Sequence, residues 1–328
     1  MAQGVQTIRR KAQRKPFTSR AAEDSRSAVS ETFSPEDLLS AKWLTCGAAL
    51  GATFLWAYWP TLVEMVHAWN TQADYSHGYF VVPLALFFLW ARRDQFPAEG
   101  LSPAILSGLT LVAVGAVLRI LGGRYFFGAF DGWSILPWVG GVCLLIGGWK
   151  FFKWALPSVL FLFFMIPLPF SAETALSLPL QGIATKLSCW SLHVLGQPAL
   201  QNGNVILLGK YPLEVAQACS GLRIFVGIAA LAFAYVIVVR RPLWEQGLLI
   251  LSVIPIALAA NVTRIVATGL LYQYSTSEAA HQFSHDIAGW VMIPWAAAMF
   301  GAVLWYMDQL FKEVYVANIG EVIRRNKA

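Results

Sequence analysis

The sequence predicts an all-α integral membrane protein, a polytopic bundle of about eight transmembrane helices. Hydrophobic residues make up 57% of the 328-residue chain, charged residues only 13%, and the mean hydropathy is +0.56. Soluble domains carry about 25% charged residues. The apolar residues also fall into runs of about 20, the length that a helix needs to cross roughly 30 Å of hydrocarbon while satisfying its own backbone hydrogen bonds.

The chain divides into three parts. Residues 1–40 are polar and rich in Arg, Lys and Ser, so we expect a disordered, basic cytoplasmic tail there. A multi-span membrane domain follows over 41–307, and residues 308–328 form a second cytoplasmic tail. Eight apolar runs of the membrane domain are predicted as spans, at 41–60, 76–91, 102–121, 133–149, 151–170, 220–239, 247–272 and 286–307.

The distribution of basic residues orients these spans. Lys and Arg are enriched in cytoplasmic loops, and most of the 24 Lys and Arg fall in inner segments when both termini are cytoplasmic. The start of span six, the outer half of span seven and the start of span eight then share the outer face of the inner membrane. Because topology accounts for the net charge of +6, we expect no nucleic-acid partner.

Three residue types that together support thiol catalysis occur in this outer layer, one per span. Cys219 stands where span six begins, Arg264 lies within span seven, and His285 opens span eight. A helix amino terminus and a nearby cation both lower a thiol pKa, and Arg223 supplies the cation. His285 can exchange protons near neutral pH. A charge inside an apolar span costs about 2.5–3.5 kcal/mol on insertion scales, so Arg264 should face a polar cavity, with Asn261 as its hydrogen-bonding companion.

The largest outer segment lies between spans five and six, at 171–218. Around residues 187–192 it is predicted to form an amphipathic helix in the membrane interface. Residues 203–215 predict a hairpin of two short strands around Gly209 and Lys210. We expect this hairpin to act as a small lid that leads the chain to the catalytic cysteine.

Two rival interpretations use the same residues. His281 and His285 are four apart and with Cys219 could bind a metal ion. Cys189 and Cys219 could instead form a disulfide in the oxidising outer compartment. We expect neither metal nor cofactor. The remaining cysteines and histidines outside the motifs are interpreted as structural: Cys46, Cys143, His67 and His193.

Four short motifs give the chain a family resemblance. They are ACSGLR at 218–223, NVTRI at 261–265, HDIAG at 285–289 and YSHGY at 75–79. In sequence and in order these resemble the motifs of the exosortase and archaeosortase family, multi-span membrane cysteine transpeptidases. One departure is visible, because Gln217 stands where the family commonly has Glu.

The resemblance implies a function for each motif. The partners would be membrane lipids and exported proteins that carry a carboxyl-terminal signal: a Pro-Glu-Pro-type motif, one transmembrane helix and a basic tail. Cys219, Arg264 and His285 would be catalytic, forming a thioester that an acceptor resolves. We expect the substrate to be contacted by three further residues: Arg223, Asn261 and His77.

Other functions fit parts of the pattern. A plain intramembrane cysteine protease would use the same residues without transfer to an acceptor. A transporter or a flippase for lipid-linked glycan would also place polar residues inside spans, although the chain shows no internal repeat of the kind common in transporters. An inactive scaffold in polysaccharide assembly is a further alternative.

Overall fold

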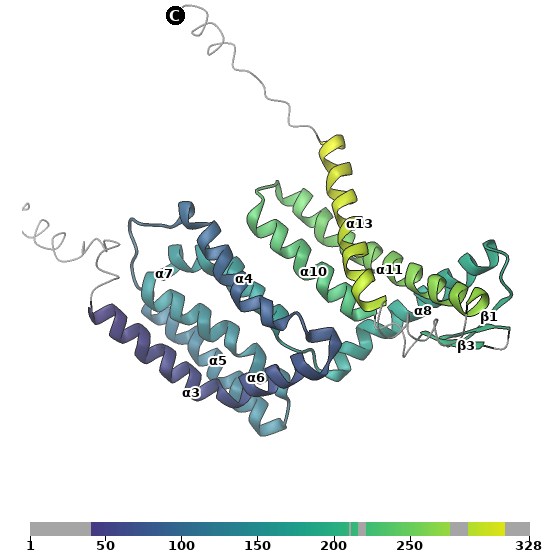
Figure 1. Ribbon diagram of the computed structural model, residues 1–328. Coiled ribbons are helices and arrows are strands. Elements are labelled where there is room, and N and C mark those ends of the chain that lie inside the picture. The colour runs from purple at the N-terminus through teal and green to yellow at the C-terminus, as the bar shows by residue number, and fades with distance from the viewer. Residues whose placement is uncertain (1–40, 210, 216–220, 276–287, 312–328) are drawn as a thin grey trace, which may run out of the picture.

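The computed structural model describes residues 41–209, 211–215, 221–275 and 288–311, and these are mainly helical. The α-helices are α3 (Ala41–Thr71), α4 (Gly78–Ala91), α5 (Ile105–Tyr125), α6 (Gly128–Trp133), α7 (Ile135–Phe161), α8 (Phe170–Val194), α10 (Gly221–Val238), α11 (Leu243–Tyr274) and α13 (Ala288–Leu310). Short 3-10 helices are η1 (Ala73–Tyr75), η2 (Arg93–Gln95) and η3 (Leu162–Met165). Helices α3 to α7 form one half of the molecule, and α8, α10, α11 and α13 form the other (Figure 1).

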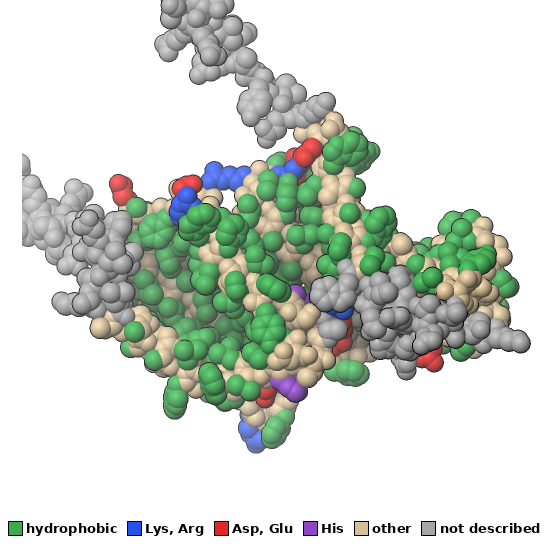
Figure 2. Space-filling model, viewed as in Figure 1, with side chains coloured by type: hydrophobic (Ala, Val, Ile, Leu, Met, Phe, Trp, Pro, Cys, Tyr) green, Lys and Arg blue, Asp and Glu red, His purple; other side chains and the backbone are tan. Residues whose placement is uncertain are grey.

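The membrane character is confirmed, but the number of spans is not. Among the described residues, four helical stretches are long and apolar enough to cross a bilayer: Ile105–Tyr125, Gly128–Met165, Leu243–Tyr274 and Val291–Leu310. Two apolar helices are shorter, Gly78–Ala91 and Leu222–Val238. Hydrophobic side chains cover most of the face in Figure 2, and charged side chains gather along one of its edges. The count of eight spans therefore stays a prediction.

The first half packs through closely spaced backbones. Gly108 and Gly115 of α5 lie against α7, where a Cβ added to Gly108 would sit 3.1 Å from the carbonyl oxygen of Gly141. The predicted fourth and fifth spans form one helical stretch that breaks at Gly148. Its φ of 69° belongs to the left-handed region, and an added Cβ would lie 1.9 Å from the carbonyl oxygen of Ser102. Only glycine fits this backbone.

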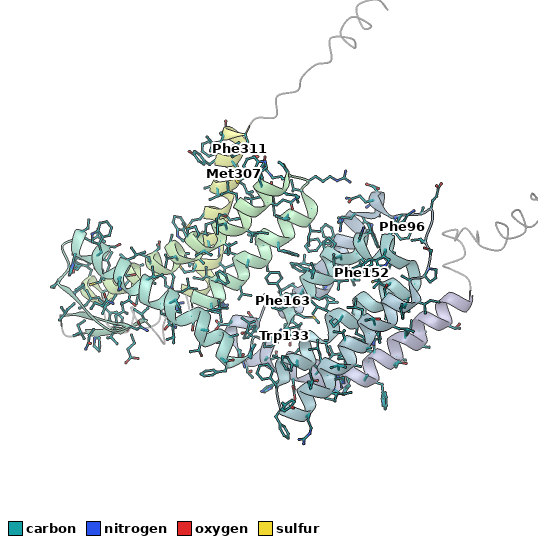
Figure 3. The ribbon with its side chains drawn as sticks, turned by 180° about the vertical axis from the view of Figure 1, so that it is seen from behind. Phe96, Trp133, Phe152, Phe163, Met307 and Phe311 are labelled. Atoms are coloured by element: carbon teal, nitrogen blue, oxygen red, sulfur yellow. The ribbon has the colours of Figure 1, made fainter. Side chains whose placement is uncertain are left out.

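The second half has its own apolar core between α10, α11 and α13, which includes Ile228, Ala260, Ala296 and Phe300. Figure 3 shows the two halves from behind, with Trp133 and Phe152 in one and Met307 and Phe311 in the other. Rings join them, since Phe233 of α10 stacks on Phe161 of α7 with centroids 6.4 Å apart. The site described below therefore sits on a continuous scaffold.

One end of this second half is tied by charge. Arg241, between α10 and α11, bonds Asp308 of α13 at 2.6 Å and Glu245 of α11 at 3.1 Å. It also donates to the hydroxyl of Tyr235 at 2.8 Å. These bonds, Asp308 first, raise the pKa of Arg241 above its usual value. Three helices are thus held together at this end.

A three-stranded antiparallel sheet stands where the sequence predicts a two-stranded hairpin. Its strands are β1 (Ala199–Asn202), β2 (Val205–Leu208) and β3 (Tyr211–Glu214), in that spatial order. The expected β2–β3 pairing is present, with Leu208 opposite Tyr211, and β1 is additional. The predicted interface helix is also longer than expected and occupies all of α8. The role of this sheet as a lid stays a prediction.

Candidate active site

A cavity of about 330 Å³ lies between α10 and α13 and has a polar head and an apolar body. The head is formed by Asp74, Ser76, His77 and Arg223, and the body by Ile224, Gly227, Ile228, Leu231, Ile293, Ala296 and Ala297. The α10 residues of the body recur three and four apart, so they line one face of that helix. Three of the lining residues are Gly or Ala, which gives the body its width.

The polar head is formed largely by the loop between α3 and α4, which hydrogen bonds hold in position. The end of α3 and the loop that follows it are bonded to the segment around η3 by three hydrogen bonds. Trp69 Nε1 of α3 donates to Met165 O at 2.9 Å. In the loop, Tyr75 Oη accepts from Leu168 N at 3.1 Å, and His77 Nε2 bonds Phe164 O at 2.9 Å. Tyr75 is buried, and burial raises its pKa to about 12. Tyr75 is therefore neutral near pH 7 and has a structural role.

His77 and Arg223 meet in this head, as the sequence suggests for two substrate contacts. His77 immediately precedes α4, which begins at Gly78. Burial lowers the pKa of His77 below its usual value of 6.5, and the positive charge of Arg223 lowers it further. The head thus combines a permanent cation with an imidazole that is neutral near pH 7, beside the Asp74 carboxylate. This charge pattern suits the polar end of an otherwise apolar ligand.

Two of the three predicted catalytic residues fall outside the described residues. Cys219 and His285 both lie in undescribed segments, as does His281. Residues on either side of them are described. Val215 is buried, Gly221 is the first residue of α10, and Ala288 is the first residue of α13. The starts of both helices that border the cavity are therefore the parts of the chain nearest to these residues in sequence.

Arg264 and Asn261 lie on α11, three residues apart. Arg264 is half-buried, while Asn261 is only 2% exposed, and its Oδ1 atom has no hydrogen-bond partner in the described structure. Neither residue lines the cavity between α10 and α13. The described structure therefore brings Arg223 and His77 together in one cavity and does not bring Asn261 or Arg264 into it.

The rival interpretations fare differently. Cys189 is a free thiol that donates to Ala199 O at 3.6 Å, so the structure does not contain the alternative disulfide. His193 bonds the same carbonyl, which agrees with a structural role. No group of three potential metal ligands occurs within the described segments, and the metal set with His281 lies outside them.

Sequence reasoning missed two members of the polar head, Asp74 and Ser76. Asp74 stands just before the second predicted span, and Ser76 is the first residue of that span. The available signal was the YSHGY motif at 75–79, which contains Ser76 and directly follows Asp74.

Comparison with known proteins gives one match. A family model described as transmembrane exosortase (Exosortase_EpsH) matches residues 69–303, which is most of the chain and includes all four motifs. No curated protein and no solved structure matches it.

Proposed function

The chain belongs to the transmembrane exosortase family, and from that membership we propose that it is a membrane-embedded cysteine transpeptidase. Its substrates are exported proteins with a carboxyl-terminal sorting signal, a short Pro-Glu-Pro-type motif followed by one transmembrane helix and a basic tail. The reaction takes place at the outer face of the inner membrane, with both termini of the enzyme in the cytoplasm.

The cavity between α10 and α13 is the observation that carries the proposal. Its apolar body has the small residues Gly227, Ala296 and Ala297, and small residues let helix backbones approach closely within a membrane. A substrate helix would lie along this body and present the polar residues at its end to His77 and Arg223. A guanidinium binds carboxylates well, so Arg223 is the group in this head that would bind an acidic residue just beyond the helix, on the side away from Asp74.

The proposed chemistry is acyl transfer in two stages. The thiolate of Cys219 attacks the scissile carbonyl while Arg264 stabilises the oxyanion. His285 then protonates the leaving amine, and the carbon–nitrogen bond breaks to give a thioester. In the second stage the neutral His285 removes a proton from the acceptor, the acceptor attacks the thioester carbonyl, and the carbon–sulfur bond breaks. Cys219 is released as a thiolate beside the protonated His285, which restores the starting state.

The primary test replaces Cys219. We expect Cys219→Ala to abolish the mobility shift of a signal-bearing exported protein on a gel, and Cys219→Ser to come close to doing so. Cys143→Ala, a partly buried cysteine of α7, serves as the matched control and should process normally. Unchanged processing in Cys219→Ala would contradict the enzyme and favour a transporter, flippase or scaffold.

Two further measurements test transfer and orientation. Mass spectrometry of the new substrate terminus should find an added group, whereas a free carboxylate would indicate a protease without transfer. A membrane-impermeant thiol reagent added outside should modify Cys219 but not Cys46. The reverse labelling pattern would overturn the orientation.

A further inference from the structure

Two arginines from opposite halves of the molecule stand at the rim of one interface. Phe88 of α4 and Ile237 of α10 are buried in the same apolar cluster. Arg92 follows Phe88 by four residues, one turn along the face that α4 buries, and its backbone N–H donates to Phe88 O at 3.0 Å. Arg240 follows Ile237 by three residues, just beyond the end of α10. Since α4 and α10 end at the same edge of the molecule (Figure 1), both arginines stand at that edge.

Arg92 is fixed against α7 by reciprocal hydrogen bonds. Its Nη1 donates to Trp154 O at 2.7 Å, and Trp154 Nε1 donates back to Arg92 O at 2.9 Å. Arg92 is half-buried, so burial lowers the pKa of its guanidinium, and the positive charge of Arg240 lowers this pKa further. These two residues, the arginine pair, are therefore close enough for their like charges to repel each other.

The arginine pair has no salt-bridge partner within the described part of the chain. Arg240 borders a cavity of about 320 Å³ that also contains Glu245 and Asp308, but Arg241 already binds both carboxylates. Asp94, in the turn after α4, is exposed and forms no salt bridge among the described residues. Two like charges held together without a counter-ion raise the free energy of the folded protein. The arginine pair therefore favours a bound anion.

Aromatic side chains place the arginine pair at the level of the lipid headgroups. Trp90 and Trp244 lie within four residues of the pair along the chain and are 60% and 53% exposed. Exposed Trp rings prefer the interface between hydrocarbon and water. Lys and Arg side chains also gather along this edge of the molecule (Figure 2). The anions present at this level of a membrane are the phosphate groups of phospholipids.

We propose that Arg92 and Arg240 bind the phosphate of an anionic phospholipid, which thereby bridges the two halves of the protein. Guanidinium groups match phosphate oxygens in bidentate geometry, and basic sites between transmembrane helices bind acidic headgroups. A zwitterionic headgroup would bring a third positive charge to the pair, so an anionic lipid is preferred. The inference rests on the membrane location of the chain and is independent of the thiol chemistry.

Thermal unfolding of Arg240→Gln in two kinds of vesicle tests the proposal. In phosphatidylcholine alone, the substitution removes repulsion within the pair, so the unfolding midpoint should stay unchanged or rise. In phosphatidylcholine mixed with phosphatidylglycerol, the substitution removes a bound ligand, so the midpoint should fall by about 2 °C. A fall of equal size in both vesicles would indicate an anion supplied by the chain itself and would overturn the proposal.

Arg124→Gln is the matched control, because it removes the same charge from an exposed position at the end of α5. It should unfold like the wild type in both vesicles. An equal fall in both variants with phosphatidylglycerol would indicate general attraction of a basic protein to acidic lipid, without a site. Inorganic phosphate added to phosphatidylcholine vesicles should leave the wild-type midpoint unchanged, and a rise as large as that with phosphatidylglycerol would assign the pair to soluble phosphate.

Native mass spectrometry measures the bound lipid directly. The wild type should retain phosphatidylglycerol about fivefold better than Arg240→Gln, as expected for the loss of one arginine near an acidic headgroup. Arg124→Gln should retain as much as the wild type. Equal retention by the wild type and Arg240→Gln would overturn the proposal.

Discussion

The α5–α7 interface and the α10–α13 interface both use small residues, with opposite results. In the first, a Cβ added to Gly141 would lie 2.6 Å from Val112 Cγ2 and 2.9 Å from Gly108 O. In the second, a Cβ added to Gly227 would meet nothing within 4 Å, and the interface contains the cavity. Small residues therefore close one interface and keep the other open.

The difference lies in what surrounds the glycines. On α5 the buried glycines recur every seven residues, at Gly108, Gly115 and Gly122, so a continuous groove accepts α7 along its length. On α10 one glycine stands among larger apolar residues, opposite Ala296 and Ala297. The comparison teaches that a repeated glycine pattern indicates helix packing, whereas a single small site beside charged residues indicates a binding surface.

The largest expected effect is on the closed interface. Gly141→Ala should lower stability by about 3 kcal/mol and the unfolding midpoint by about 5–10 °C, because the new methyl group meets backbone atoms that cannot move aside. Thermal unfolding of the purified protein in detergent measures this. Gly227→Ala is the matched substitution and should unfold like the wild type. Equal losses in both variants would break the comparison.

The next effect is on the open interface and concerns activity. Gly227→Leu should fill the cavity body without disturbing the fold, and substrate processing should fall by at least about tenfold, as expected when an apolar pocket loses its room. Processing is followed by the gel shift of a signal-bearing protein. Gly182→Leu, on α8 with equally open surroundings, is the control. Normal processing by Gly227→Leu would separate the cavity from substrate binding.

The smallest effect is on pH dependence and belongs to the polar head. Because burial lowers the pKa of His77 in the folded protein below 6.5, the unfolded chain takes up the proton first as the pH falls. This contribution to stability is complete above about pH 6.5 and declines as the pH falls below it. His77→Gln should therefore lose less stability than the wild type between pH 7.5 and pH 5.5.

The control for this measurement is His67→Gln, an exposed histidine of α3. The His67→Gln variant should lose as much stability as the wild type when the pH is lowered from 7.5 to 5.5. If the wild type and His77→Gln lost the same stability between pH 7.5 and pH 5.5, the pKa of His77 would not be lowered by burial in the polar head.

Much of the fold follows from the sequence because apolar runs must become helices in lipid. Helices α5 and α11 occur close to the predicted ranges 102–121 and 247–272. Helix α3 runs past its expected end at residue 60, since Pro60 lies inside the helix and not at its boundary. The sequence does not predict α8 as one long helix. Its composition is mixed, and only its packing in the structure shows that it has two opposite faces.

The candidate site was predictable in part. The sequence could suggest His77 and Arg223 as substrate contacts, because each belongs to a short polar motif beside an apolar run. It could not show that they share one cavity, since 146 positions separate them in the numbering. Nor could it show that Asn261 does not line this cavity. These facts depend on helix rotation, which hydropathy does not determine.

The position of the cavity has a kinetic consequence. Arg241 ties α10, α11 and α13 together at one end, and the cavity occupies the other end of α10. Under the proposed docking, a substrate already anchored in the bilayer arrives sideways by two-dimensional diffusion and never dissolves in water. Its encounter rate then depends on molecules per unit of membrane area. Adding lipid should slow the reaction, and adding buffer should not.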